Sequence, residues 1–101
     1  MSIIVTGYFD LDPAKREDFI AAATTAMTAT RAEEGNESYA FTADLEDPGR
    51  FYVTELWATQ EAMDSHMTTA HLAAFMGAMG GFGVTGASLT KWDGATASTL
   101  M

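Results

Sequence analysis

The chain has 101 residues, no cysteine and a formal net charge of −9 at pH 7. At this length we expect a single domain spanning residues 1–101, with its folded core in about residues 3–92. The lack of cysteine excludes disulfide bonds, thiolate metal sites and cysteine nucleophiles. Because nucleic acids and anionic membrane surfaces would repel so acidic a chain, we expect neither as a partner.

The first predicted elements are a strand and a helix. Residues 3–9 are mostly β-branched or aromatic and apolar on both faces, which is typical of a strand covered on both sides. The dipeptide Asp12-Pro13 predicts a helix start, with the aspartate as N-cap and the proline at the first helical position. Apolar side chains then recur at helical spacing over residues 19–30. Gly35 is suited to a left-handed helix end, so the helix is expected to end near residues 33–34.

Two more strands are predicted in the middle of the chain. Residues 38–45 alternate between larger apolar side chains, the last of them Leu45, and small or polar ones. Asp47-Pro48-Gly49 is typical of a turn. Residues 51–57 again alternate, and both of their faces are largely apolar, so they predict a third strand.

A second helical region and a last strand complete the chain. Thr59 is the expected helix cap, and the region can break near Thr69. The glycines from Gly77 to Gly83 end it, residues 84–92 predict the fourth strand, and residues 93–101 form a tail without an assigned element. The second helical region carries apolar and histidine side chains: Met63, His66, Met67, Leu72, Phe75, Met76 and Met79.

The order strand-helix-strand, tight turn, strand-helix-strand predicts an α+β, ferredoxin-like fold. Such a fold has four antiparallel strands with both helices on one face of the sheet. Tyr8, Tyr52 and Leu56, or their alternating neighbours, make the other face apolar as well. A large exposed apolar sheet face is not expected on a soluble monomer. We therefore expect a homodimer in which two sheets pack face to face.

The N-terminal segment has no basic region and no long apolar stretch before a small-residue cleavage site. No signal peptide is therefore expected. The longest uncharged run, residues 67–90, is rich in glycine and threonine, which is a poor composition for a membrane span. These features predict a cytoplasmic protein without a membrane partner.

The two histidines, His66 and His71, are candidates for proton transfer or metal binding. On a continuous helix, five residues turn through about 500°, so the two side chains would lie about 140° apart. Metal-binding pairs on a helix are spaced by three or four residues, so this spacing is unfavourable unless the helix breaks between them. A third ligand would have to be a carboxylate such as Glu55. We expect no metal site.

Glu55 is unusual because Val53 and Trp57 flank it on the same face of an apolar strand. A buried carboxylate without a partner is unfavourable, so we expect a cation, a histidine or polar groups beside it. Either Glu55 is a structural partner of an arginine or of backbone and hydroxyl donors, or it orients or charges a histidine in a functional site. The acidic residues within 33–37 are interpreted as a solvated loop, and the methionines of the second helical region as core or pocket lining.

These features resemble the antibiotic biosynthesis monooxygenase (ABM) family over nearly the whole chain, from about Ile3 to Trp92. The matching motifs are the early strand followed by Glu34-Gly35-Asn36-x-x-Tyr39, Phe51-Tyr52-Val53-x-Glu55-x-Trp57, and His66-x-x-x-x-His71 with Phe75. The resemblance implies a dimeric α/β barrel with a pocket between helices and sheet in each protomer. It also implies several activities: oxidation of quinols or aromatic polyketides without metal or flavin, haem degradation, and processing of a phosphorylated quorum-sensing signal. The segment 51–71 looks most like the quinol-oxidising and signal-processing branches.

The resemblance also allows a test of the haem-degrading branch. Where those members carry a pocket asparagine, an ungapped comparison places Gly7; where they carry a pocket tryptophan, it places His66. Their axial haem histidine corresponds to Met76. These three departures predict that the chain does not degrade haem, and we expect no cofactor. The second departure suggests that the side chain at position 66 faces the cavity.

The predicted function is oxygenation of a small aromatic or quinol substrate by dioxygen, without a cofactor. A phenolate or hydroquinone anion can donate an electron to dioxygen, so the protein needs a base, a dry apolar pocket and orientation of the substrate. A base in such a pocket would also serve an isomerase of a small carbonyl or signal compound. A non-catalytic ligand-binding or structural dimer is the third alternative. The predicted catalytic residues are His66, His71 and Glu55; the predicted substrate-binding residues are Trp57, Phe75, Met76 and Gly7.

Overall fold

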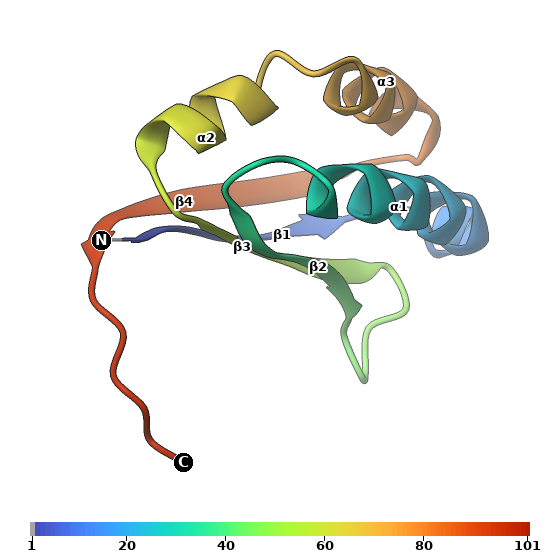
Figure 1. Ribbon diagram of the computed structural model, residues 1–101. Helices are drawn as coiled ribbons and strands as arrows, with labels where there is room; N and C mark the ends of the chain where they lie inside the picture. Colours follow the sequence, from blue (N-terminus) through green and yellow to red (C-terminus); the bar gives the residue numbers. More distant parts are fainter. Residues whose placement is uncertain (1) are drawn as a thin grey trace.

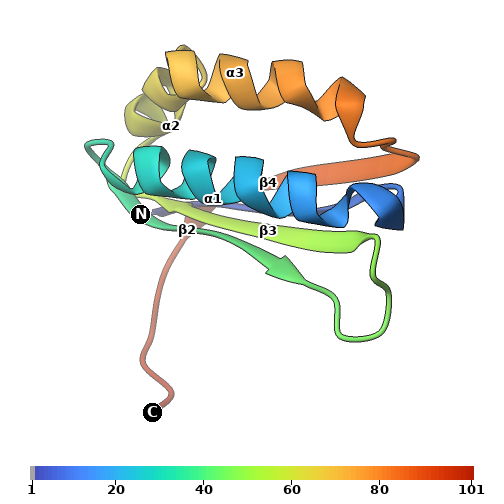
Figure 2. The same ribbon diagram turned by 90° about the vertical axis from the view of Figure 1, so that its right-hand side faces the viewer.

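The computed structural model describes residues 2–101, which form one antiparallel sheet with helices on one face (Figure 1). The strands lie in the order β2-β3-β1-β4. Figure 2 shows α1, α2 and α3 on the same side of this sheet. This arrangement confirms the predicted ferredoxin-like α+β fold. The elements in chain order are β1 (Ser2–Asp10), η1 (Pro13–Lys15), α1 (Arg16–Arg31), β2 (Asn36–Ala43), β3 (Arg50–Trp57), α2 (Gln60–His66), α3 (Ala70–Ala78), η2 (Met79–Gly81) and β4 (Gly86–Ala95).

The first helix begins later and ends earlier than predicted. Pro13 opens the short 3₁₀ helix η1 rather than α1, and the Asp12 side chain caps η1 by accepting a hydrogen bond from the Ala14 N–H at 2.9 Å. The last residue of α1 is Arg31. The chain then reverses through Gly35, whose φ of 82° is the left-handed conformation that the sequence predicts there. The early end of α1 leaves residues 32–35 in a turn.

The ends of β2 and β4 also differ from the prediction. Leu45, the predicted end of the second strand, is fully exposed in the loop that follows β2. The Asp44 carboxylate accepts hydrogen bonds from two backbone N–H groups of that loop, at 2.8 and 2.9 Å, which turns the chain out of the strand ladder. β4 covers Gly86–Ala95 instead of residues 84–92, because its pairing with β1 starts opposite Asp10 and continues to Ala95. Three residues of the predicted tail therefore belong to the sheet.

Phe19 of α1 lies at the centre of the core, and it is completely buried. Its ring packs against those of Phe41, Phe51, Phe75 and Phe82, with ring-centroid distances between 4.5 and 6.0 Å. These rings come from β2, β3, α3 and the segment before β4, so one side chain joins every layer of the fold. A second group of buried apolar side chains, which includes Trp57, continues the core towards α2.

The sheet face opposite the helices carries large side chains, as predicted. Ile4, Tyr8 and Leu56 are half-buried there, and Trp92 is 55% exposed. The Trp92 indole N–H donates a hydrogen bond to the Thr6 hydroxyl at 3.0 Å, which holds the ring across β1. The homodimer expected from this face stays a prediction. No helix within residues 2–101 is long and apolar enough to cross a membrane.

Candidate active site

A cavity of about 240 Å³ lies between the sheet and the helices α2 and α3. Tyr39 and Glu55 from the sheet and His66 from α2 line it and supply a phenol, a carboxyl group and an imidazole. A small apolar cavity with a few convergent polar groups is the usual form of a small-molecule site. The rest of the wall is mostly apolar: Val5, Phe9, Phe41, Val53, Met63, Met67, Leu72, Phe75, Met76 and Leu89, with Thr90 and Lys91 at the β4 side.

The break between α2 and α3 determines where the two histidines lie. α2 ends at His66, and Thr69 caps α3 by accepting a hydrogen bond from the Leu72 N–H at 3.3 Å. The Thr69 hydroxyl also donates to the carbonyl of His66 at 2.8 Å. Because the histidines belong to different helices, the separation of about 140° expected on a continuous helix does not apply. The ring centroids of His66 and His71 are 6.1 Å apart.

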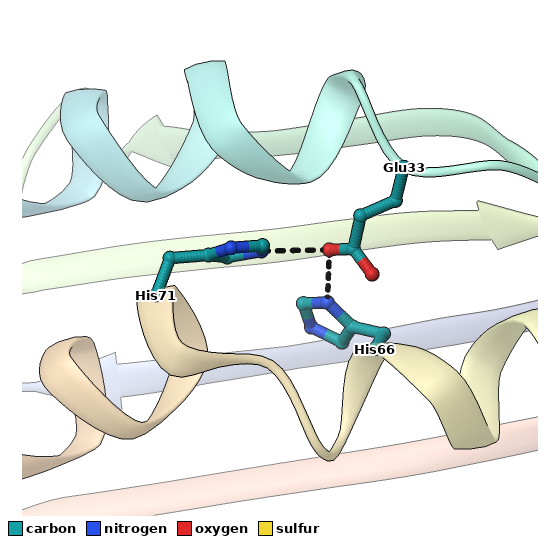
Figure 3. Close-up of side chains that lie close together, drawn as sticks. All are labelled: Glu33, His66 and His71. Carbon is teal, nitrogen blue, oxygen red and sulfur yellow. Dashed lines mark hydrogen bonds and ion pairs between the residues drawn. The ribbon is translucent and has the colours of Figure 1, made fainter.

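Glu33 lies between the two imidazole rings (Figure 3). Its Oε2 atom is 2.7 Å from Nδ1 of His66 and 2.8 Å from Nε2 of His71. The turn after α1 positions it, since the Glu33 N–H donates to the carbonyl of Thr30 at 3.0 Å. The side chain is only 13% exposed, so the interpretation of Glu33 as part of a solvated loop is wrong. The sequence offers no clear signal for this role, because a Glu-Glu pair before a glycine is also typical of an exposed turn.

Glu33, His66 and His71 also form the one group of side chains in residues 2–101 whose donor atoms could hold a metal ion, all within 4.8 Å of one another. Two imidazole nitrogens and a carboxylate oxygen suit Zn²⁺ chemically. Ligands bound to one ion at about 2.0–2.2 Å would, however, lie about 3 Å or more from each other. The observed 2.7 and 2.8 Å are hydrogen-bond distances. The geometry is therefore that of a hydrogen-bonded cluster, in which Glu33 takes the place expected for Glu55.

Glu55 extends from β3 towards the cavity and is 8% exposed. Its Oε1 atom accepts a hydrogen bond from the Trp57 indole N–H at 3.0 Å, so its partner is this indole rather than an arginine. Burial raises the pKa of Glu55 above its ordinary value of 4.5, although the Trp57 hydrogen bond and His66 act in the opposite direction. The cavity thus holds a carboxyl group that is easier to protonate than one in water.

Tyr39 supplies a phenol to the same cavity. Burial, together with the carboxylates of Glu55 and Glu33, raises the pKa of Tyr39 above its ordinary value of 10.0. The phenol therefore stays neutral and can donate a hydrogen bond to a ligand. Sequence reasoning did not place Tyr39 in the site, although it ends one of the motifs that carry the family resemblance. Its ring packs edge-on to His66 at a centroid distance of 5.6 Å.

The sequence model of the family described as "Antibiotic biosynthesis monooxygenase" matches residues 2–78 of the chain. The chain is also 34% identical over 74 residues to "Putative monooxygenase YcnE" of Bacillus subtilis, an alignment that covers 73% of this chain and 78% of that protein. The chain belongs to the antibiotic biosynthesis monooxygenase family. This confirms the resemblance seen in the sequence.

Two further comparisons found similar proteins for this family member. It is 34% identical over 74 residues to "Uncharacterized protein sll1783" of Synechocystis, and the alignment covers 73% of this chain and 50% of that protein. A crystal structure from Deinococcus radiodurans, described as that of "a putative antibiotic biosynthesis monooxygenase", matches with a TM-score of 0.90. The two chains are 25% identical, and the match covers 98% of each. Nearly the whole of this chain therefore has the fold of that structure.

Four of the residues predicted for the site of this family member line the cavity. They are His66, Glu55, Phe75 and Met76. His66 is 2% exposed and packs against the Trp57 ring at a centroid distance of 4.8 Å, so its position is fixed by its neighbours. Their roles towards a substrate stay predictions.

The other three predicted residues lie outside the cavity lining. Trp57 is completely buried and packs against the His66 ring, outside the residues that line the cavity. Gly7 lies on β1 opposite Leu89 of β4, and a side chain at Gly7 would collide with the backbone of that strand. Leu89 lines the cavity in its place. His71 reaches Glu33 from α3 and lines a separate groove between α1 and α3.

The raised pKa of Glu55 predicts a pH-dependent difference between this family member and its Glu55→Gln variant. A carboxyl whose folded pKa lies above its unfolded value contributes stability at low pH, and that contribution is lost as the pH rises from about 4.5 through the folded pKa. Glutamine keeps an acceptor for Trp57 but has no charge. The free energy of unfolding of Glu55→Gln should therefore exceed that of the wild type by an amount that grows with pH. Urea unfolding from pH 4.5 to neutral pH measures it.

Glu46→Gln is the matched control, because it removes the same charge from an exposed loop residue. We expect it to change the unfolding free energy by less than about 0.5 kcal/mol. A Glu55→Gln variant that is less stable than the wild type at neutral pH would contradict this account of the buried carboxyl.

Proposed function

We propose that this member of the antibiotic biosynthesis monooxygenase family oxygenates a small aromatic or quinol substrate with dioxygen, without a bound cofactor. His66 acts as the base. The observation that carries the proposal is the placement of a buried imidazole, held through Nδ1, in the wall of an apolar cavity of about 240 Å³. Membership of the family and the name of the Bacillus subtilis relative support the reaction class.

The proposed reaction needs little more than a base and a dry pocket. Removal of a proton from a quinol hydroxyl gives an anion that can donate an electron to dioxygen, and the resulting radical pair combines at a ring carbon. A quinol and one dioxygen then give a hydroxyquinone and one water, with the substrate itself supplying the four electrons. Histidine suits the first step because its imidazole titrates near neutral pH. Apolar walls suit the second, because they exclude the water that would otherwise solvate the anion.

Tyr39 and Glu55 have supporting roles in this proposal. Both line the cavity with His66. The Tyr39 phenol, kept neutral by its raised pKa, can donate a hydrogen bond to a substrate oxygen. The Glu55 carboxyl can take part in proton transfer near neutral pH more readily than an exposed carboxyl, because burial raises its pKa.

The pair formed by Glu55 and His66 also favours a second candidate function. Two proton-transfer groups on one cavity are what an isomerase of a small carbonyl compound requires: one removes the α-proton and the other returns a proton to the neighbouring carbon. The two functions differ in their observable products. An isomerase would exchange α-protons of its ligand with solvent and consume no dioxygen.

Oxygen uptake tests the proposed function. The purified chain, without added flavin or metal, is incubated with a panel of benzo- and naphthohydroquinones and anthrone-like aromatics. We expect dioxygen consumption above the protein-free rate for at least one compound, and one atom of ¹⁸O from labelled dioxygen in its product. Uptake equal to the protein-free rate for the whole panel would overturn the proposal for these substrates. α-Proton exchange in D₂O, followed by NMR, would then favour the isomerase.

We also propose that the chain forms a homodimer through the sheet face opposite the helices. Support comes from the half-buried side chains Ile4, Tyr8 and Leu56 on that face, beside the exposed ring of Trp92. Sedimentation equilibrium at micromolar concentration should give twice the monomer mass. The Trp92→Glu variant places a charge on this face and should shift the equilibrium to the monomer. A wild-type chain that sediments as a monomer would refute the dimer.

A further inference from the structure

We propose that Glu33 is a positioning residue that holds His66 in its Nδ1–H tautomer and so leaves the Nε2 lone pair free to act as the base. His71, in turn, fixes the Glu33 carboxylate. This inference deepens the proposed function and rests on it for the role of His66. It differs from the expectation for Glu55, because the carboxylate that reaches an imidazole comes from the turn after α1, more than thirty residues earlier in the chain.

The tautomer follows from what a carboxylate can bind. An ionised carboxylate only accepts hydrogen bonds, so a ring nitrogen at hydrogen-bond distance from it must carry the proton. For His66 that nitrogen is Nδ1, at 2.7 Å from Oε2 of Glu33. The neutral ring then has its lone pair on Nε2, which points away from Glu33. Since His66 lines the cavity and Glu33 does not, the free nitrogen is the one available to a ligand.

The same rule gives His71 the opposite tautomer. Its Nε2 is 2.8 Å from the same oxygen of Glu33 and must therefore be the protonated nitrogen. Figure 3 shows both ring nitrogens at one oxygen of Glu33, and two N–H donors on one oxygen restrict the rotation of the carboxylate. The side chain of His66 is 3% exposed, that of Glu33 13% and that of His71 27%. Water therefore competes less for the hydrogen bond between Glu33 and His66 than for the one between Glu33 and His71.

This arrangement also compensates the charge that forms during the reaction. When Nε2 of His66 takes the proton of a substrate hydroxyl, the ring becomes an imidazolium that lies against the Glu33 carboxylate. The substrate anion keeps the electron pair of the broken O–H bond, and the proton returns to a product oxygen or to water in a later step. A cation in a buried position is strongly disfavoured without such a partner. Glu33 thus places an opposite charge beside the imidazolium without touching the substrate.

Nitrogen NMR of ¹⁵N-histidine-labelled protein tests the inference without reference to activity. Long-range ¹H–¹⁵N correlations distinguish a protonated from an unprotonated ring nitrogen, and the chain has only two histidines. We expect Nδ1–H for His66 and Nε2–H for His71 when the rings are neutral. The His71→Gln variant, whose amide can still donate to Glu33, leaves a single ring and so gives the assignment. Protonation of His66 on Nε2 in the wild type would overturn the inference.

Variants of Glu33 add a kinetic readout. Glu33→Ala removes the acceptor, so His66 should lose its preference for Nδ1–H, and kcat should fall by about 10²- to 10⁴-fold with little change in KM, because Glu33 is not part of the cavity wall. Glu33→Gln keeps an acceptor oxygen but no charge, and should retain more of the Nδ1–H tautomer than the alanine variant. Glu34→Ala is the matched control, since it removes an exposed carboxylate one residue away.

The outcomes separate the two proposals. Unchanged tautomers and unchanged kcat in Glu33→Ala would overturn the positioning role of Glu33 even if the wild type oxidises quinols. The expected tautomers in a wild type that consumes no dioxygen would instead overturn the proposed function and leave the arrangement of Glu33, His66 and His71 intact.

Discussion

Replacing His66 with asparagine is expected to lower kcat by about 10²- to 10⁴-fold, which is the usual contribution of a general base. The amide nitrogen of the introduced asparagine would stand near the position of Nδ1, so the donor to Glu33 at 2.7 Å has a substitute. The variant lacks the second ring nitrogen, which is the atom that takes the substrate proton in the proposed reaction. The rate of dioxygen uptake with the best substrate of the panel measures the effect.

Two controls show whether such a loss comes from chemistry or from packing. His66 lies against Trp57 with a centroid distance of 4.8 Å, so the smaller asparagine also removes buried contact and should lower the melting temperature. A melting curve shows whether the variant is folded at the assay temperature. Ser65→Asn introduces the same residue at the neighbouring exposed position of α2 and should keep wild-type kcat. If His66→Asn retained kcat within about twofold, His66 would not be the base.

Phe19→Ala is expected to lower the free energy of unfolding by about 3–5 kcal/mol. The residue is completely buried and packs against four other aromatic rings, so its removal leaves a cavity whose walls belong to different layers. The loss is a large part of the about 5–15 kcal/mol that a domain normally has. The melting temperature should fall by more than about 10 °C. Urea unfolding followed by circular dichroism measures the change.

Phe19→Leu and Thr28→Ala are the comparison variants. Leucine retains most of the apolar volume, so Phe19→Leu should lower the free energy of unfolding much less than Phe19→Ala. Thr28 lies on the exposed side of the same helix, so its replacement should change the unfolding free energy by no more than about 0.5 kcal/mol. A loss below about 1 kcal/mol for Phe19→Ala would mean that the core refills around the missing ring.

The sequence contained enough local information to predict the order of the elements. Periodicity in a sequence reports which side of an element is buried. α1 buries the apolar side that the helical spacing over residues 19–30 predicts, and β3 shows the alternation of buried and more exposed residues expected for residues 51–57. Gly35 takes its left-handed conformation and Thr69 caps a helix, because both are local effects of one residue on its own backbone. The ends of the elements were predicted less accurately, because side chains such as that of Asp44 bind backbone N–H groups near the end of a strand.

The candidate site could be predicted only in part. The prediction found His66 and Glu55 because a titratable side chain within an apolar segment is visible in the sequence. Glu33 and Tyr39 were missed, because neither interrupts a pattern: an acidic residue after a helix is normally solvated, and a tyrosine in a strand normally serves the core. Gly7 and Trp57 were expected at the cavity, but the tertiary packing of Leu89 and His66 separates them from it.

By itself, the sequence of this chain determined its fold, its family and the presence of a histidine in an apolar setting, because these depend on periodicity and on short motifs. Only the tertiary structure decided which carboxylate meets that histidine. Glu33 and His66 are 33 positions apart: Glu33 lies in the turn at residues 32–35, and His66 ends α2 before the break at residues 67–69. A contact between residues of two elements so far apart in the chain has no periodic signature in the sequence, because periodicity reports only which side of one element is buried.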